Sequence, residues 1–164
     1  MKRICYIVLV LIIMPLLVSC VTDPETYYFN ADDIVEKIIK IELVNSTNEN
    51  PKNVIVDNDT ILSFNMQNTT FIKELDKNKI EDFVRELSTI TFHIGDKSVN
   101  SPLGYTLILY MENQEIIVLS CTVLNGTAYG MVAVFTPEGN FINHIAEFAD
   151  EPKFRKLLEK YFDV

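Results

Sequence analysis

The stretch YTLILYMENQEIIVLSCTV, residues 105–123, decides the fold. Two apolar runs flank a turn at Glu112-Asn113-Gln114, and within each run alternate residues share one face of an extended strand. The first faces are formed by Tyr105, Leu107, Leu109 and Met111, and by Ile117, Leu119, Cys121 and Val123. The second faces are apolar as well, through Ile108, Tyr110, Ile116 and Val118. Strands that are apolar on both faces are typical of the centre of a sheet, so we predict two central strands that are covered on both sides.

Shorter strands are predicted on either side of this pair. Their patterns fall at residues 39–43, 54–56, 61–66, 71–75, 131–135 and 141–145. Asp57-Asn58-Asp59-Thr60 is predicted to be a turn, because Asn and Asp tolerate turn backbones. Thr136-Pro137-Glu138-Gly139-Asn140 is predicted to close a hairpin, since proline presets φ and glycine accepts positive φ. The strands therefore follow one another through hairpins, as in an antiparallel sheet.

Three helices are predicted around the sheet. Asp32 and Asp33 precede a short apolar pattern that ends near Ile38 and suit the positive end of a helix. Asn78 and Glu81 have the spacing of a capping box. The stripe that follows them consists of Ile80, Phe83, Val84 and Leu87. A C-terminal helix begins near Asp150 or Glu151 with Pro152 in its first turn. Its stripe consists of Phe154, Leu157, Leu158 and Tyr161.

These patterns together predict an α+β fold. We expect a mainly antiparallel sheet of about five to seven strands, with two or three helices packed on it, including the C-terminal helix. Residues 31–164 form a single domain in this interpretation, because their number suits one ordinary core.

The first twenty residues carry a different kind of pattern. Lys2 and Arg3 precede an apolar run from Ile4 to Val18, and Leu17-Val18-Ser19-Cys20 ends the run. This segment resembles a bacterial lipoprotein signal peptide with its lipobox. The resemblance implies that residues 1–19 are removed and that the thiol of Cys20 carries a diacylglycerol. The alternative is an uncleaved membrane helix, but Pro15 and the length of the apolar run suit a signal peptide better.

The resemblance also implies a location. The chain is expected to be extracytoplasmic and anchored by lipid to the outer face of the plasma membrane, or to the outer membrane if the source is Gram-negative. Residues 20–30, which contain Pro24, are interpreted as the lipidated cysteine and a tether. The lipid is the only expected link to the membrane, and no other cofactor is expected.

Charge narrows the possible partners. The chain has 14 cationic and 23 acidic side chains, and loss of Lys2 and Arg3 with the signal changes its formal charge from −9 to −11. A surface this acidic repels nucleic-acid phosphates and anionic lipids, so nucleic-acid binding is not expected. Cys121 would be the only thiol left free, which excludes an intramolecular disulfide.

Candidate chemistry is sparse. Cys121 could pair with His93 or His144, with Asp96 or Glu147 as the third group, yet its alternation with Leu119 favours a core cysteine. Two scattered histidines and one thiol do not form a zinc motif, so no metal site is predicted. Asp57-Asn58-Asp59 lacks the glycine of a calcium loop, which favours a solvated turn.

Six aromatic residues remain as candidates for a recognition surface, although strand aromatics more often pack in the core. They are Tyr27, Tyr28, Phe29, Tyr105, Tyr110 and Tyr129.

The sequence thus favours a binding protein over an enzyme. Our first hypothesis is a surface-anchored, non-enzymatic module of the interaction, inhibitor or immunity type that binds a protein or peptide. A small-ligand-binding or envelope-assembly domain that uses a concave sheet face is the alternative. A carboxylate-based hydrolase is the third, since any two of the 23 acids could converge in the fold.

Overall fold

The computed structural model describes residues 25–46, 52–56, 59–63, 69–94, 104–124, 127–148 and 151–164. The strands in these ranges are β1 (Glu25–Tyr27), β2 (Ile38–Ser46), β3 (Lys52–Val56), β4 (Asp59–Ser63), β5 (Thr69–Glu74), β6 (Phe92–Ile94), β7 (Gly104–Met111), β8 (Ile116–Leu124), β9 (Thr127–Phe135) and β10 (Phe141–Phe148). The α-helices are α2 (Ala31–Ile34), α3 (Ile80–Leu87) and α4 (Glu151–Phe162), and the 3-10 turns are η1 (Val35–Lys37) and η3 (Lys77–Lys79).

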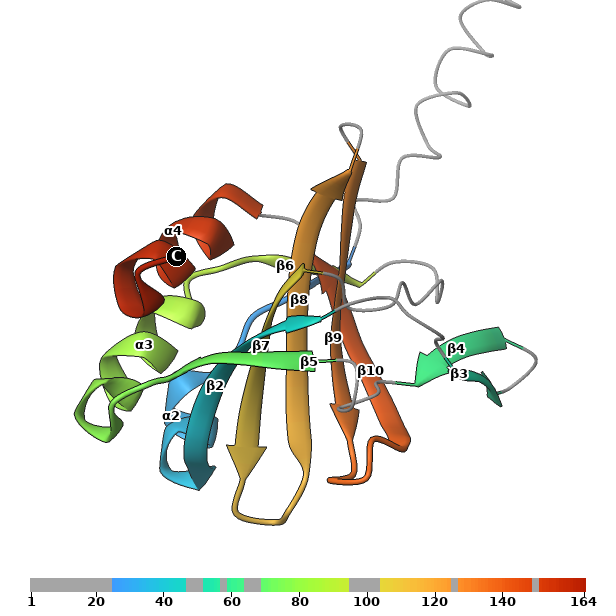
Figure 1. Cartoon of the computed structure of the whole chain (residues 1–164), viewed down its shortest axis with the longest axis horizontal. Coiled ribbons are helices and arrows are strands. Elements are labelled where there is room, and N and C mark those ends of the chain that lie inside the picture. The colour runs from blue at the N-terminus through green and yellow to red at the C-terminus, as the bar shows by residue number, and fades with distance from the viewer. Residues whose placement is uncertain are drawn as a thin grey trace, which may run out of the picture.

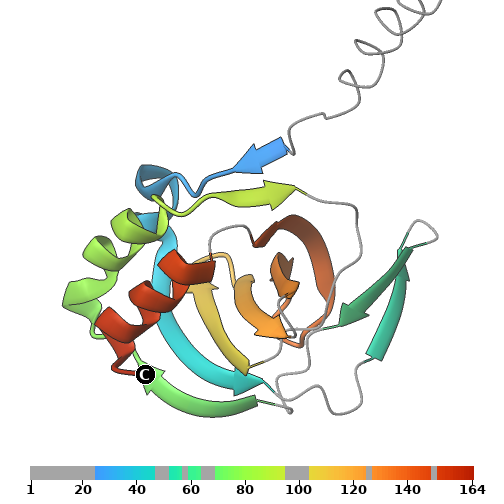
Figure 2. The same cartoon turned by 90° about the horizontal axis from the view of Figure 1, so that it is seen from above.

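The strands form one large curved sheet and one hairpin (Figures 1 and 2). The large sheet has the order β1-β6-β10-β9-β8-β7-β2-β5, and its described pairings are antiparallel. Strands β3 and β4 pair only with each other. The prediction of an α+β fold with a mainly antiparallel sheet and a C-terminal helix is confirmed. The main sheet has eight strands, beyond the expected five to seven, because β1 and β6 add two short strands at one edge.

The predicted central pair lies at the centre. β7 and β8 pair with each other and are flanked by β2 and β9, and residues 106–109 and 116–120 are buried without interruption. Their two faces belong to two apolar clusters. The larger cluster joins Leu107, Leu109 and Leu119 to the helices. The smaller one includes Ile108, Val118 and Phe135 on the opposite face.

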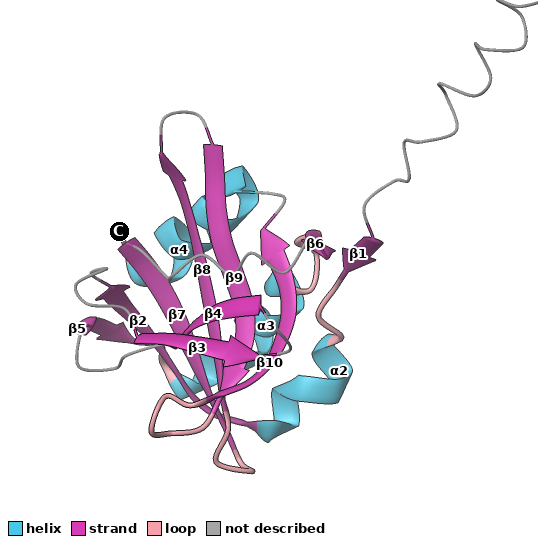
Figure 3. Cartoon of the chain, turned by 90° about the vertical axis from the view of Figure 1, so that its right-hand side faces the viewer, coloured by secondary structure: helices cyan, strands magenta, loops and turns pink. Residues whose placement is uncertain are grey.

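The helices and the β3–β4 hairpin lie on opposite sides of this sheet (Figures 1 and 3). Helix α3 buries Ile80, Phe83, Val84 and Leu87, and α4 buries Phe154, Leu157, Leu158, Tyr161 and Phe162. Both predicted stripes are therefore confirmed, because the 3.6-residue repeat places these side chains on the sheet side.

The tether prediction is wrong for residues 25–30. Glu25–Tyr27 pairs with β6, and Phe29 is only 2% exposed. The ring of Phe29 packs edge-on against Tyr27 at 5.3 Å and Phe92 at 5.4 Å. Burial of this aromatic residue fixes the chain to the sheet edge, so the domain begins earlier than expected. Residues 20–24, with the rest of the predicted tether and Cys20, lie outside the described residues.

The capping-box prediction is also wrong. Asn78 lies inside η3, and α3 begins after Lys79, which makes no side-chain capping hydrogen bond. Instead of reaching back to the helix start, Glu81 accepts hydrogen bonds from Arg85 at 2.9 and 3.1 Å. The ion pair one turn ahead thus replaces the expected reciprocal cap.

The first helix is shorter than its sequence pattern indicated. Asn30 caps α2 by accepting a hydrogen bond from the backbone N–H of Asp32 at 3.2 Å. The chain then passes through η1, and Ile38 starts β2. The hairpin turn before β10 is as predicted, with Gly139 at φ 85°. The turn predicted at residues 57–60 is wrong for Asp59 and Thr60, which begin β4 and pair with β3, while Asp57 and Asn58 lie outside the described residues.

Candidate functional site

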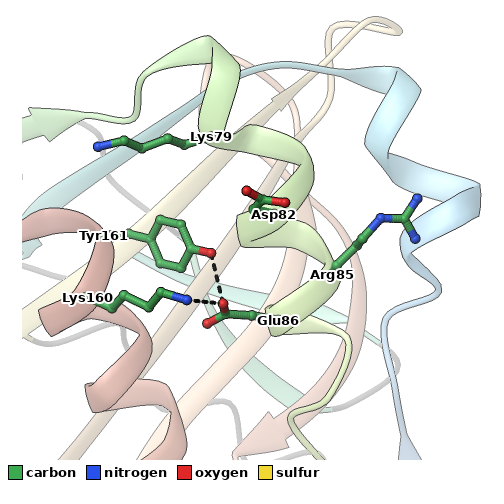
Figure 4. A pocket seen from close by; sticks show the side chains of 6 residues that line it. All are labelled: Lys79, Asp82, Arg85, Glu86, Lys160 and Tyr161. Atoms are coloured by element: carbon green, nitrogen blue, oxygen red, sulfur yellow. Dashed lines mark hydrogen bonds and ion pairs between the residues drawn. The ribbon is translucent and has the colours of Figure 1, made fainter.

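A groove lies between α3 and α4 in the helical layer (Figure 4). Its volume is about 570 Å³, and both helices contribute polar side chains to its walls. The lining residues are Lys79, Asp82, Arg85, Glu86, Lys160 and Tyr161. They line the groove because the apolar stripes of the two amphipathic helices face inward, which leaves their polar residues along the seam.

Buried aromatic rings hold the two walls together. The ring of Phe83 on α3 packs edge-on against Tyr161 at 5.2 Å and Phe162 at 5.9 Å on α4. Phe83 is fully buried. Edge-to-face pairs of this kind favour one relative placement of the rings, so they set the width of the groove above them.

Glu86 occupies the middle of the groove. Its Oε1 atom accepts a hydrogen bond from the Tyr161 hydroxyl at 3.0 Å and a second one from the Lys160 ammonium. Figure 4 shows both donors pointing to this carboxylate from α4. The Lys160 ammonium also lies 4.9 Å from the centre of the Tyr161 ring. Glu86 therefore joins the two helices through two donors on the opposite wall.

This contact shifts two pKa values. The hydrogen bond to Glu86 raises the pKa of Lys160. Burial, followed by the hydrogen bond to Glu86, raises the pKa of Tyr161. Both groups therefore keep their protons at neutral pH and remain donors.

Arg85 lies at the α2 side of the groove. Its guanidinium pairs with Glu81 at 2.9 Å and with Asp32 at 3.4 Å, and the Glu81 hydrogen bond raises its pKa. In Figure 4 its side chain points away from Glu86 toward α2. Arg85 thus ties α3 to α2 and leaves the centre of the groove to Glu86, Lys160 and Tyr161.

The groove continues along α4. A second hollow of about 210 Å³ shares Glu86 and Lys160 with the first. It adds Thr89, Ile90, Lys153, Lys156 and Leu157 to the lining. We refer to the two hollows together as the α3–α4 groove. Five cationic side chains and two carboxylates line it, although the whole chain has a formal charge of −9.

A separate polar cluster lies on the other face of the sheet. Tyr110 donates a hydrogen bond to Glu42 at 2.6 Å, and Lys40 pairs with the same carboxylate at 2.8 Å. The Lys40 ammonium lies 4.1 Å from the centre of the Tyr110 ring. Burial and the Glu42 carboxylate raise the pKa of Tyr110. The three partners satisfy one another, which is typical of a structural contact across β2 and β7.

Three buried polar atoms on that face make no hydrogen bond within the described part of the chain. They are Ser46 Oγ, Ser120 Oγ and His144 Nε2. Ser120 and His144 are cross-strand neighbours of Met131 and Ala133, which belong to the smaller apolar cluster. The face therefore combines apolar side chains with unused hydrogen-bonding groups.

The sheet does not bring Cys121 next to either histidine, so the Cys–His pair considered from the sequence is not formed. Cys121 on β8 pairs with Gly130, whereas His144 lies two strands away on β10, opposite Ala133. Strand spacing alone separates their backbones by about 10 Å. His93 lies on β6, one strand further away. The side chain of Cys121 and all of Asp96 lie outside the described residues.

One suggested pair of a histidine and an acid is adjacent in the backbone register. His93 and Glu147 are cross-strand neighbours on β6 and β10. They lie away from Cys121 in the strand order, so they do not complete a triad with it.

The aromatic candidates divide between core and surface. Phe29 is buried, Tyr27 and Tyr110 are half-buried, and Tyr28 and Tyr105 are 52% and 46% exposed. The side chain of Tyr129 is outside the described part. None of these residues lines the α3–α4 groove as described.

Two further findings concern the described ranges alone. No group of three or more His, Cys, Asp or Glu side chains there has the arrangement of a metal site. No helix there has both the length and the apolar character needed to cross a membrane.

Sequence reasoning did not find the α3–α4 groove. A signal was present, since four of the 14 cations fall in the last fourteen residues: Lys153, Arg155, Lys156 and Lys160. The lysines among them line a groove only because α3 forms the other wall, and α3 lies more than sixty residues earlier in the chain.

Comparison with known proteins finds no family model, no curated protein and no solved structure that matches this chain.

Proposed function

We propose that this protein is a non-enzymatic binding module that recognises a protein or peptide through the α3–α4 groove. In this proposal, lipid on Cys20 holds it outside the cytoplasm at the membrane surface. The observation that carries the binding role is the groove itself, which gathers five cations on the surface of an acidic chain. Modules of the inhibitor or immunity type work in this way, by occupying a partner rather than transforming it.

The lining of the groove supports a polypeptide partner. Sites for small molecules are concave and mainly apolar, with a few polar groups. Here the side chains around Glu86 are charged or hydroxylated, and Lys160 keeps 58% of its side chain exposed. Long exposed side chains of both signs match the polar rim of a protein interface.

The small-ligand alternative has one observation in its favour. Ser46, Ser120 and His144 place unused polar atoms beside the apolar cluster on the sheet face opposite the helices. A ligand with hydrogen-bonding groups would satisfy them. The α3–α4 groove remains the stronger candidate, because it is an open hollow with described walls.

Position-specific crosslinking tests the proposal. A photoreactive amino acid replaces Thr89, which is exposed and lines the groove, and the matched control replaces Thr70, which is exposed on β5. The full-length lipoprotein is expressed in its own host, irradiated, and its adducts are identified by mass spectrometry. We expect one recurring protein adduct at position 89 that is absent at position 70. The same adducts at both positions, or none at position 89, would contradict the proposal.

A further inference from the structure

The α3–α4 groove is lined by more cations than carboxylates, on a chain that is acidic overall. Its cations are Lys79, Arg85, Lys153, Lys156 and Lys160, and its only carboxylates are Asp82 and Glu86. The whole chain, by comparison, has nine more acidic than basic side chains. Lys79 pairs with Asp76 at 3.3 Å, and Arg85 pairs with Glu81 and Asp32. The positive field on this surface therefore comes from the cations of α4, which attract an anionic group.

The cations on α4 are spaced for a polypeptide. Lys153, Lys156 and Lys160 are three and four residues apart, which places them along one side of the helix. Their backbones are about 4.5 and 6 Å apart along the helix axis, at a rise of about 1.5 Å per residue. Every second side chain of an extended peptide points the same way, about 6.8 Å apart. The step from Lys156 to Lys160 is close to this spacing, so two carboxylates at alternate positions of a peptide can reach both lysines.

Glu86 already occupies the position of such a carboxylate. It accepts hydrogen bonds from Lys160 and Tyr161 across the groove. Lys156, by contrast, has no ion-pair partner among the described residues, and it lines the same groove. One carboxylate of an incoming segment can pair with Lys156, and another can compete with Glu86 for the hydrogen bonds of Lys160 and Tyr161.

We propose that the α3–α4 groove binds an extended acidic peptide segment, whose carboxylates pair with Lys156 and replace Glu86 on Lys160 and Tyr161. The inference rests on the proposed function and names the chemistry of its partner. Glu86 acts as an internal competitor, which keeps the groove ordered while it is empty. A segment with few carboxylates therefore does not displace Glu86 from Lys160 and Tyr161.

A discrete peptide fits the groove better than an anionic membrane surface. Asp82 and Glu86 lie among the cations, and Glu81 is exposed on the same helix. A continuous layer of phosphates would press against these carboxylates, and such juxtaposition of like charges is unfavourable. A peptide places its carboxylates only where the cations are.

Binding of defined peptides tests the proposal. The probe is a fluorescein-labelled octapeptide of alternating glutamate and alanine, and its matched control has lysine in place of glutamate. Anisotropy is measured with the full chain in neutral detergent micelles. We expect the glutamate peptide to bind with an affinity that falls as salt rises, and the lysine peptide not to bind.

Three variants locate the binding. Lys156→Glu is expected to weaken binding of the glutamate peptide about tenfold or more, as loss of a charge pair at a binding surface does. Lys37→Glu makes the same change of charge on η1 and is expected to leave the affinity within about twofold, because Lys37 does not line the groove and exposed charges are screened by salt. Glu86→Gln is expected to tighten binding, because it removes the competing carboxylate.

The outcomes separate this inference from the proposed function. Equal weakening by Lys156→Glu and Lys37→Glu, or weaker binding by Glu86→Gln, overturns the acidic-peptide inference. Crosslinking at position 89 would still support the proposed function in that case. The chain is also reconstituted in phosphatidylcholine vesicles with and without phosphatidylglycerol. Loss of peptide binding only with the anionic lipid would show that lipid head groups fill the groove, and would overturn the inference.

Discussion

At the residue scale, the structure separates two histidines that the sequence presented as equal candidates. His144 lies within the sheet on β10, with a buried Nε2 atom that makes no hydrogen bond in the described part of the chain. His93 lies near the sheet edge on β6, between Thr26 and Glu147. His93 also has a buried ring nitrogen, Nδ1, that makes no hydrogen bond among the described residues, so the two histidines differ in their place in the sheet, which the sequence does not encode locally.

The burial of His144 predicts a pH dependence of stability. Burial lowers its pKa in the folded chain, while the unfolded chain keeps a value of about 6.5. As the pH falls through about 6.5, the unfolded chain takes up this proton first, so the free energy of unfolding decreases until the pH passes the lower folded pKa. Above this window His144 is neutral in both the folded and the unfolded chain, so it does not contribute to the pH dependence of the free energy of unfolding.

We expect the free energy of unfolding of His144→Gln to depend less on pH in this window than that of the wild-type chain. Urea unfolding of both chains between pH 7.5 and 5 checks the prediction, because the difference between them removes the contribution of the carboxylates. An NMR titration of the His144 ring gives an independent reading. A folded pKa at or above about 6.5 would be incompatible with the proposed origin of the slope.

At the element scale, α3 and α4 depend on each other. Each is amphipathic, and they meet at Phe83, whose ring contacts Tyr161 and Phe162. Helix α3 has eight residues and lacks a side-chain cap. Isolated helices this short are marginal in water, so its stability comes from packing.

Phe83→Ala is therefore expected to destabilise the domain by about 3–5 kcal/mol, since it removes a fully buried ring and leaves a cavity. Phe71→Ala is the matched control, because Phe71 on β5 is 59% exposed, and its expected cost is below about 0.5 kcal/mol. The midpoints of urea unfolding measure both changes. Equal midpoints for the two variants would refute the role given to Phe83.

The elements also show where sequence patterns succeed. The long strands β7 and β8 and helix α4 were predictable, because each repeats its apolar period several times. Strands β1 and β6 were not, since three residues are too few to show a period. They are strands because they pair with each other and because β6 also pairs with β10.

At the scale of the whole molecule, charge is divided between regions. The chain is acidic overall, yet the α3–α4 groove is lined mainly by cations. An acidic net charge by itself favours a basic partner. The groove instead favours an acidic one, because a partner responds to the local field at the surface that it touches.

The predicted lipid anchor also belongs to this scale. Mass spectrometry of the mature wild-type protein is expected to find Cys20 at the N-terminus with diacylglycerol attached. Cys20→Ala is expected to leave no lipid-anchored protein in the membrane fraction, because acyl chains contribute about 0.8 kcal/mol per buried CH₂. Cys121→Ala is the control and should remain anchored. An N-terminus at another residue, or Cys20 without lipid, would refute the resemblance to lipoproteins.

The sequence by itself determined the α+β class, the central strands and the buried stripes of α3 and α4. These follow from local periodicity, which depends only on neighbours along the chain. The tertiary structure alone decided that β2 pairs with β7, that Phe29 joins the core, and that α3 and α4 form a groove. Each of these depends on contacts between segments far apart in the sequence, and such contacts are selected by the packing of the whole chain rather than by any local pattern.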